Sequence, residues 1–164
     1  MNTNLKAKKP VRRIEPLPWE LYRGAVAAVF SLYIEERKQL FTDGNIFSVF
    51  EKILLNECRW FDCAVSVYLF MPDHCHILME GNGFTSEPLR ASEGFRQKTG
   101  HWLLQHQMSF AWKNYFDHRL MKNKSEIEGQ IRYILANPVR KGIAGNWHEY
   151  KYKGSTAYDL AKWT

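Results

Sequence analysis

The sequence predicts one α+β domain, in which an antiparallel sheet carries two helices on one face. Its 164 residues, 45% of them hydrophobic, suffice for one well-packed domain and are too few for two. Segments of strand-like composition and segments of helical periodicity follow in the order strand, helix, strand, strand, helix, strand, helix. The first six elements match the ferredoxin-like split βαβ plan, in which strands one and three are central.

The first half of this order comes from local patterns. Residues 24–34, GAVAAVFSLYI, are rich in small, β-branched and aromatic residues and predict the first strand. The turn TDG at 42–44 precedes residues 46–58, whose apolar side chains fall on one helical stripe. CAVSVYLF at 63–70 predicts the second strand, MPD a turn, and HCHILME at 74–80 the third strand.

The second half is read in the same way. A loop at 81–88 is followed by a predicted helix at about 89–105 and by a loosely alternating strand at 110–120. The last helix is expected to begin at Ser125, with Glu128 three residues later as in a capping box, and to stop at Pro138. Being additional to the split βαβ plan, this C-terminal helix is free to cover the remaining face of the sheet.

Composition limits the classes of function. The net charge of +6 favours a polyanionic partner, nucleic acid first and an anionic membrane second. The apolar runs are too short to span a membrane, and neither a signal peptide nor zinc-finger cysteine spacing is present, so we expect a reduced cytoplasmic protein. Residues 1–18 predict a basic tail, either a solvated extension or an arm along a phosphate backbone, and residues 19–164 a single domain.

Two histidines lie one residue apart in the third strand. Side chains alternate along a strand, so His74 and His76 share a face, while Cys75 between them points to the other face. Two imidazoles at this spacing can bind one metal ion. Alternatively, each ring forms a local hydrogen bond or is solvated, because a short His-x-His pattern is common.

A tyrosine on the last helix is a second candidate. On a helical wheel Tyr133 lies nearly opposite the apolar stripe, with Gln130 and Asn137 on its own side. The phenol is either an exposed or interface side chain or a nucleophile beside an amide that can offer an oxygen ligand. The apolar stripe consists of Ile127, Ile131, Ile134 and Leu135.

Three motifs together resemble a known family. MPDHCHIL resembles the His-hydrophobe-His (HUH) motif of single-tyrosine HUH transposases. WKNYFDHRL followed by IRYILANPVRKG resembles segments of REP-associated tyrosine transposases. The resemblance runs from about the first strand to Gly142, and Asp73 stands where the family usually has Asn.

The resemblance implies a metal-dependent single-stranded DNA endonuclease and strand transferase that acts on hairpin-forming repeat DNA. Tyr133 would be the nucleophile, forming a 5′-phosphotyrosine intermediate, and His74 and His76 would be metal ligands. Asn137 would be the third ligand, with Gln130 as the alternative. The expected ion is Mg²⁺ or Mn²⁺, because Mn²⁺ accepts both oxygen and imidazole ligands.

The remaining expectations concern partners. The resemblance implies single-stranded DNA carrying hairpins as the partner and hence association with the nucleoid. No membrane is expected, and a homodimer is left open. The alternative function is a catalytically silent, domesticated DNA-binding protein of the same fold. Candidate DNA-binding residues, chosen for positive charge or for a ring that stacks on bases, are Lys8, Lys9, Arg12, Arg13, Arg90, Arg96, Lys98, Trp112, Tyr115, His118, Arg119, Arg140 and Lys141.

Overall fold

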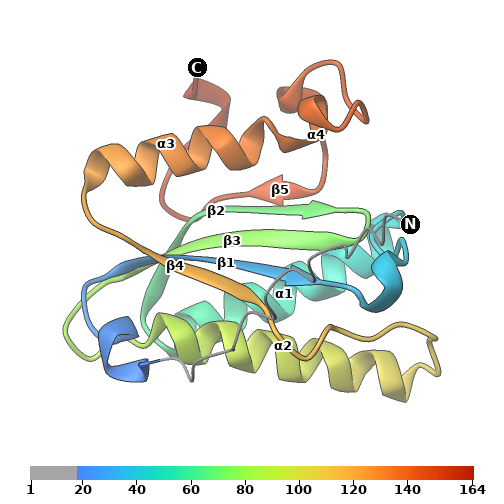
Figure 1. Ribbon diagram of the computed structural model, residues 1–164, viewed down its shortest axis with the longest axis horizontal. Helices are drawn as coiled ribbons and strands as arrows, with labels where there is room; N and C mark the ends of the chain where they lie inside the picture. Colours follow the sequence, from blue (N-terminus) through green and yellow to red (C-terminus); the bar gives the residue numbers. More distant parts are fainter. Residues whose placement is uncertain (1–17) are drawn as a thin grey trace, which may run out of the picture.

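A computed structural model describes residues 18–164, so Lys8, Lys9, Arg12 and Arg13 lie outside the described residues. Five antiparallel strands form one sheet in the order β4-β1-β3-β2-β5 (Figure 1). The first four strands have the predicted ferredoxin-like order, with β1 and β3 central, and β5 extends the sheet beyond β2. The main elements are β1 (Ala27–Tyr33), α1 (Gly44–Trp60), β2 (Cys63–Met71), β3 (His74–Gly81), α2 (Pro88–Gln105), β4 (Asp117–Met121), α3 (Lys124–Leu135), α4 (Asn137–Arg140) and β5 (Lys153–Gly154).

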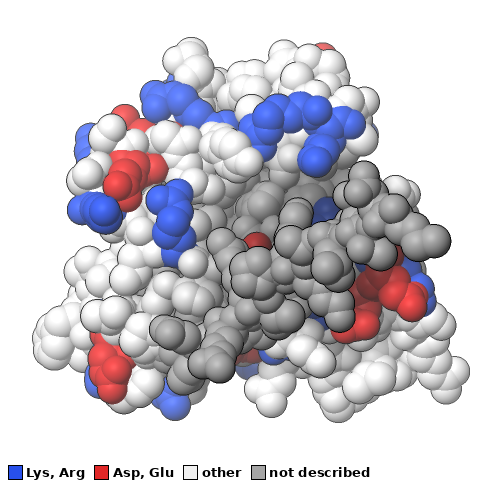
Figure 2. Space-filling model, in the orientation of Figure 1, with Lys and Arg blue, Asp and Glu red and all other residues white. Residues whose placement is uncertain are grey.

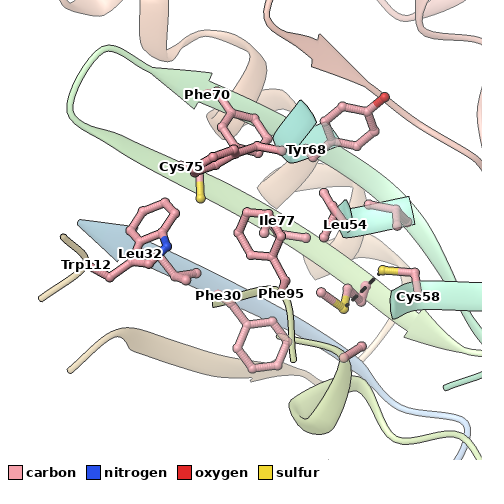
Figure 3. Packing of buried hydrophobic residues seen from close by; sticks show 14 of the residues in the cluster. Phe30, Leu32, Leu54, Cys58, Tyr68, Phe70, Cys75, Ile77, Phe95 and Trp112 are labelled. Atoms are coloured by element: carbon pink, nitrogen blue, oxygen red, sulfur yellow. Dashed lines mark hydrogen bonds between the residues drawn. The ribbon is translucent and has the colours of Figure 1, made fainter. Parts of the chain in front are cut away.

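The helices lie on both faces of the sheet. Helices α1 and α2 pack on one face, and α3 covers the other (Figure 1). The larger core lies between the sheet and α1–α2 and is lined by aromatic and aliphatic side chains, with Cys75 pointing into it (Figure 3). The α3 stripe packs on the opposite face through Ile131, Ile134 and Leu135, as its spacing predicts.

The start of α3 differs from the prediction. Asn123, not Ser125, is the N-cap, and its side chain accepts a hydrogen bond from the Glu126 amide. Glu126 in turn accepts from the amide of Lys122, so the polar pairing at this end lies two residues before the predicted capping box. The helix ends at Leu135, and Pro138 lies in the first turn of the short helix α4, where its missing N–H costs nothing.

The fourth strand is shorter than predicted. Only Asp117–Met121 pair with β1, whereas Trp112 forms one isolated bridge with Ile34. The residues between them, 113–116, are outside the sheet. The segment 110–120 therefore makes two separate contacts, one of β4 with Ala27–Ser31 and one of Trp112 with Ile34, just after β1.

The segment after α4 folds back over the sheet. Phe70 donates its amide to the Tyr152 carbonyl, and the Tyr150 hydroxyl donates to the Phe70 carbonyl. These contacts place β5 beside β2 (Figure 1). None of the helices within residues 18–164 is long and apolar enough to cross a membrane.

Candidate active site

The two histidines lie side by side on the face of the sheet that α3 covers. His74 and His76 occupy the start of β3, and their ring centroids are 4.8 Å apart with the rings nearly perpendicular. Their cross-strand partners on β1 are Tyr33 and Ser31. Cys75 projects to the opposite core, as strand alternation predicts.

Hydrogen bonds fix which ring nitrogens are free. His74 Nδ1 lies 2.6 Å from Asp73 Oδ1. Because a carboxylate only accepts, the His74 hydrogen is on Nδ1 and the lone pair on Nε2. His76 Nδ1 lies 2.7 Å from Ser31 Oγ, which can accept in the same way. Both rings can then present Nε2 as a donor atom, the arrangement usual in metal-binding histidines.

Burial keeps both rings neutral. Desolvation lowers the pKa of His74, and the positive charges of Arg37 and Lys141 lower it further, while Asp73 opposes them. Desolvation lowers the pKa of His76 to about 3, with contributions from His74, Arg140 and Arg37. A neutral imidazole is the form that binds metal ions.

Asp73 is the charged member of this group. Burial alone would raise its pKa, but hydrogen bonds from His74 and from Arg37 hold the pKa below its usual value. Arg37 Nε donates to Asp73 Oδ2 at 2.7 Å. Asp73 therefore stays ionised, and it orients the His74 ring through a charge-assisted hydrogen bond.

The structure distinguishes the two amides proposed as a third ligand. Asn137 is buried, with 4% of its surface exposed, and its Nδ2 lies 3.4 Å from His74 Nε2. Gln130 instead accepts a hydrogen bond from Arg119 at 2.9 Å. The helical geometry around Pro138 thus brings Asn137 to the histidines. Rotating the side-chain amide by half a turn would place Oδ1 instead of Nδ2 beside His74 Nε2.

Tyr133 lies four residues before Asn137 and points outward. Its side chain is 57% exposed, opposite the buried stripe of α3 as the wheel predicts. The Arg140 guanidinium lies 4.0 Å from the Tyr133 ring centroid, and Arg140 Nη1 donates to the Tyr133 carbonyl at 2.8 Å. Within residues 18–164 no hydrogen bond joins the Tyr133 hydroxyl to either imidazole.

The side chains present fit a divalent ion. No group of three or more His, Cys, Asp or Glu residues within 18–164 could hold a metal. A set of three ligands therefore needs a different residue type, and the Asn137 amide is the one that contacts His74. Two neutral imidazole nitrogens and one amide oxygen suit a transition-metal ion such as Mn²⁺ better than they suit Mg²⁺.

Some of the predicted DNA-binding residues lie near this site. Arg140 and Lys141 are close enough for their charges to lower the pKa values of His76 and His74, respectively. Arg119 lies on β4 and contacts Gln130 of α3, and Tyr115 is 48% exposed just before β4. Figure 2 shows Lys and Arg side chains gathered over the part of the molecule that carries α3 and α4.

Other predicted DNA-binding residues belong to the opposite layer. Arg90, Arg96 and Lys98 are on α2, and Lys98 forms an ion pair with the buried Glu57 of α1. His118 points to the same side and is hydrogen-bonded to Tyr22. These four residues therefore lie away from the two histidines, because α2 and α3 cover different faces of the sheet (Figure 1).

The prediction that Trp112 stacks on DNA bases is wrong. Its side chain is 7% exposed and packs among Phe41, Phe50 and Phe95. Figure 3 shows Trp112 within the larger core that also contains Phe95. Its Nε1 donates to Thr99 Oγ1 at 2.8 Å, so the indole N–H is also satisfied inside the protein. A buried ring cannot stack on a nucleotide.

Sequence reasoning missed several residues around the histidines. Ser31 and Tyr33 lie in the segment that the sequence predicts as the first strand, and Arg37 lies in a segment for which it predicts no element. A polar Ser31 within FSLY was a signal, because it alternates with buried Phe30 and Leu32. Its meaning depends on the register of β1 against β3, which a single sequence does not give.

Comparisons with known proteins bear on the fold. The sequence matches no protein-family model and shows no significant similarity to any curated protein. Among solved structures, it is similar to a REP-associated tyrosine transposase bound to a REP hairpin, with a TM-score of 0.72 and 15% identity over 94% of this chain and 87% of that chain. This chain has the fold of that transposase.

A second solved structure, from Deinococcus radiodurans R1, aligns with a TM-score of 0.44 and 14% identity, over 80% of this chain and 97% of the other. The similarity to the REP-associated transposase confirms the α+β architecture expected from the order of the predicted strands and helices. At 15% identity this similarity extends to the fold, and the roles of individual side chains follow from the site itself.

Proposed function

We propose that the protein is a transposase of the REP-associated tyrosine type, which cuts and rejoins single-stranded DNA next to a hairpin. The contact between Asn137 and His74 is the observation that carries this proposal, because it puts the end of the helix bearing Tyr133 against the histidine pair. The similar structure, which is a transposase bound to a REP hairpin, supports the same substrate class.

The proposed reaction is a transesterification. The Tyr133 oxygen bonds to the phosphorus, the bond from phosphorus to the 3′ oxygen breaks, and the phenol loses a proton while the leaving oxygen gains one. The products are a 5′-phosphotyrosine and a free 3′-hydroxyl. One phosphodiester replaces another, so the step needs no nucleotide hydrolysis and is reversible.

The chain's own residues would divide the work in this reaction. His74, His76 and Asn137 would hold a divalent ion, which supplies positive charge to offset the negative phosphate oxygens. Asp73 and Ser31 orient the two rings through their Nδ1 atoms. The guanidinium of Arg140 sits over the Tyr133 ring, where its charge attracts the phosphate that the tyrosine attacks.

A denaturing gel tests this function. The full chain is mixed with Mn²⁺ and a pool of hairpin-bearing single-stranded oligonucleotides, and we expect a covalent protein–DNA band. Tyr133→Phe should abolish the band, because it removes only the nucleophilic oxygen. Tyr158→Phe, which alters a surface tyrosine in the C-terminal segment, should keep it.

The controls decide between catalysis and binding alone. If the unaltered protein binds the hairpins but forms no adduct across the pool, the protein is a silent DNA-binding module. If an adduct forms equally well with Tyr133→Phe, the assignment of the nucleophile is wrong.

A further inference from the structure

A short segment, residues 111–115, runs along the end of β1 beside the histidines. The Lys113 amide donates to the Tyr33 carbonyl at 2.8 Å, and the Glu35 amide donates to the Ala111 carbonyl at 2.8 Å. Arg96 of α2 donates to the Lys113 carbonyl at 2.8 Å. With Trp112 anchored in the core, these bonds fix the segment and leave Tyr115 on its outer side.

Tyr33 connects this segment to the candidate active site. It is paired with His74 across the β1–β3 ladder, and its ring stacks on the His74 ring with a centroid distance of 5.4 Å and an angle of 24°. Its hydroxyl donates to Asp117 Oδ2 at 3.2 Å. Burial and Asp117 raise the pKa of Tyr33, so this phenol is poorly suited to act as a nucleophile.

Arg37 reaches the same place from a strained turn. Glu36 and Arg37 adopt φ values of 56° and 54°, a region that costs non-glycine residues free energy. The turn brings the Arg37 guanidinium to Asp73 and to 5.0 Å from the Tyr33 ring centroid. The Arg37 side chain is 48% exposed, and Nε is the one nitrogen of this side chain that forms a hydrogen bond within residues 18–164.

Aromatic and cationic groups alternate along this edge. The Lys113 ammonium lies 5.9 Å from the Tyr33 ring centroid and 5.8 Å from that of Tyr115. Together Tyr33, Arg37, Lys113 and Tyr115 form a row of two rings and two positive charges that begins at His74. Nucleic-acid-binding grooves combine the same two features, positive charge for phosphates and rings on which unpaired bases stack.

We propose that this row, which we call the Tyr33–Tyr115 edge, binds an unpaired nucleotide next to the reacting phosphate. Arg37 and Lys113 contact its phosphates, and the exposed Tyr115 ring stacks on its base. A base inside a duplex has no free face for such stacking, so the edge selects unpaired DNA. This inference rests on the proposed function and adds where the strand beside the cleavage site lies.

Anisotropy of a labelled oligonucleotide tests the edge without any catalytic step. The probes are a DNA hairpin with an unpaired tail and the same hairpin without it, measured with the full chain in the presence of EDTA. Tyr115→Ala should weaken binding of the tailed probe about 5- to 150-fold, which corresponds to the stacking of one base. It should leave binding of the blunt hairpin unchanged.

Charge gives a second, independent readout. Lys113→Ala should reduce the slope of log K against log salt for the tailed probe by about 0.7, as expected for one lost phosphate contact. Two matched controls remove similar groups elsewhere: Phe84→Ala, in the exposed loop beyond the far end of β3, and Lys52→Ala on α1. Both should bind the tailed probe like the unaltered protein.

The outcomes separate this inference from the proposed function. If Tyr115→Ala and Lys113→Ala bind the tailed probe normally while adduct formation at Tyr133 persists, the edge is not a nucleotide site and the proposed function stands. An equal loss with the blunt hairpin would also overturn the edge. If the unaltered protein binds neither probe, both the edge and the proposed function are wrong.

Discussion

Two neighbouring side chains orient the His74 ring, and its Nε2 faces Asn137, which follows the C-terminal end of α3. Asp73 accepts the Nδ1 hydrogen, and Tyr33 stacks on the ring. Asn137 then lies 3.4 Å from Nε2. A buried amide needs a polar partner, and a buried imidazole nitrogen needs one as well, so the contact satisfies both.

Replacing each candidate amide in turn tests the third ligand. We expect Asn137→Ala to weaken Mn²⁺ binding, because it removes the amide beside His74, while Gln130→Ala leaves Mn²⁺ binding unchanged. Titration calorimetry of the two variants measures the difference directly. Equal weakening, or a larger effect of Gln130→Ala, would mean that Asn137 is not the ligand.

Asp73 offers a test of how the first histidine is oriented. Loss of a carboxylate behind a metal-binding histidine typically costs 10- to 100-fold in metal affinity, and we expect a loss of about that size for Asp73→Ala. Asp73→Asn should lose much less, because its amide oxygen can still accept from His74 Nδ1. The measurement is again Mn²⁺ affinity, and an Asp73→Ala protein with normal affinity would refute the role.

The segment at 111–115 shows how a core residue can place surface residues. Trp112 packs among aromatic rings of the core on the α1–α2 side. Lys113, the next residue, lies outside this core, near the rings of Tyr33 and Tyr115. The segment WKNY does not predict this division, because a tryptophan followed by polar residues is equally compatible with a ring that stacks on bases.

The burial of Trp112 leads to a stability prediction. Trp112→Ala should lower the free energy of unfolding by about 3–5 kcal/mol, because it leaves a large cavity and removes the hydrogen bond that the indole N–H donates to Thr99 Oγ1. Trp60→Ala, at a residue 82% exposed, should change it by less than about 0.5 kcal/mol. Urea denaturation measures both, and similar values for the two variants would contradict the packing described here.

Periodicity predicted the elements that bury a stripe, and it failed where structure depends on partners. The α3 stripe and the outward direction of Tyr133 follow from helical spacing alone. By contrast, β5 consists of Lys153 and Gly154, too short for any pattern, and exists because β2 offers it an edge. The N-cap moved to Asn123 because several residues in NKSE can cap a helix, and local sequence does not rank them.

At the scale of the whole molecule, both faces of the sheet bury apolar side chains, but they differ in the polar groups that they carry. The α1–α2 face holds the larger aromatic core, and the α3 face holds the histidines, Asn137 and the nearby positive charges. Alternation along β3 produces this division within four residues, since Cys75 and Ile77 point into the core and His74 and His76 point away from it. The three motifs pointed to His74, His76 and Asn137. Ser31 and Tyr33 beside them are identified only by the register of β1 against β3.

The central claim is that Tyr133 is the residue that becomes covalently bonded to DNA. Trypsin cuts after Arg132 and Arg140, and the resulting peptide 133–140, YILANPVR, contains a single tyrosine. After reaction with a hairpin oligonucleotide, Mn²⁺ and nuclease trimming, mass spectrometry should find this peptide carrying a nucleotide phosphate. A nucleotide phosphate on any other peptide would contradict the account. So would the absence of a modified peptide from a protein that has cleaved the DNA.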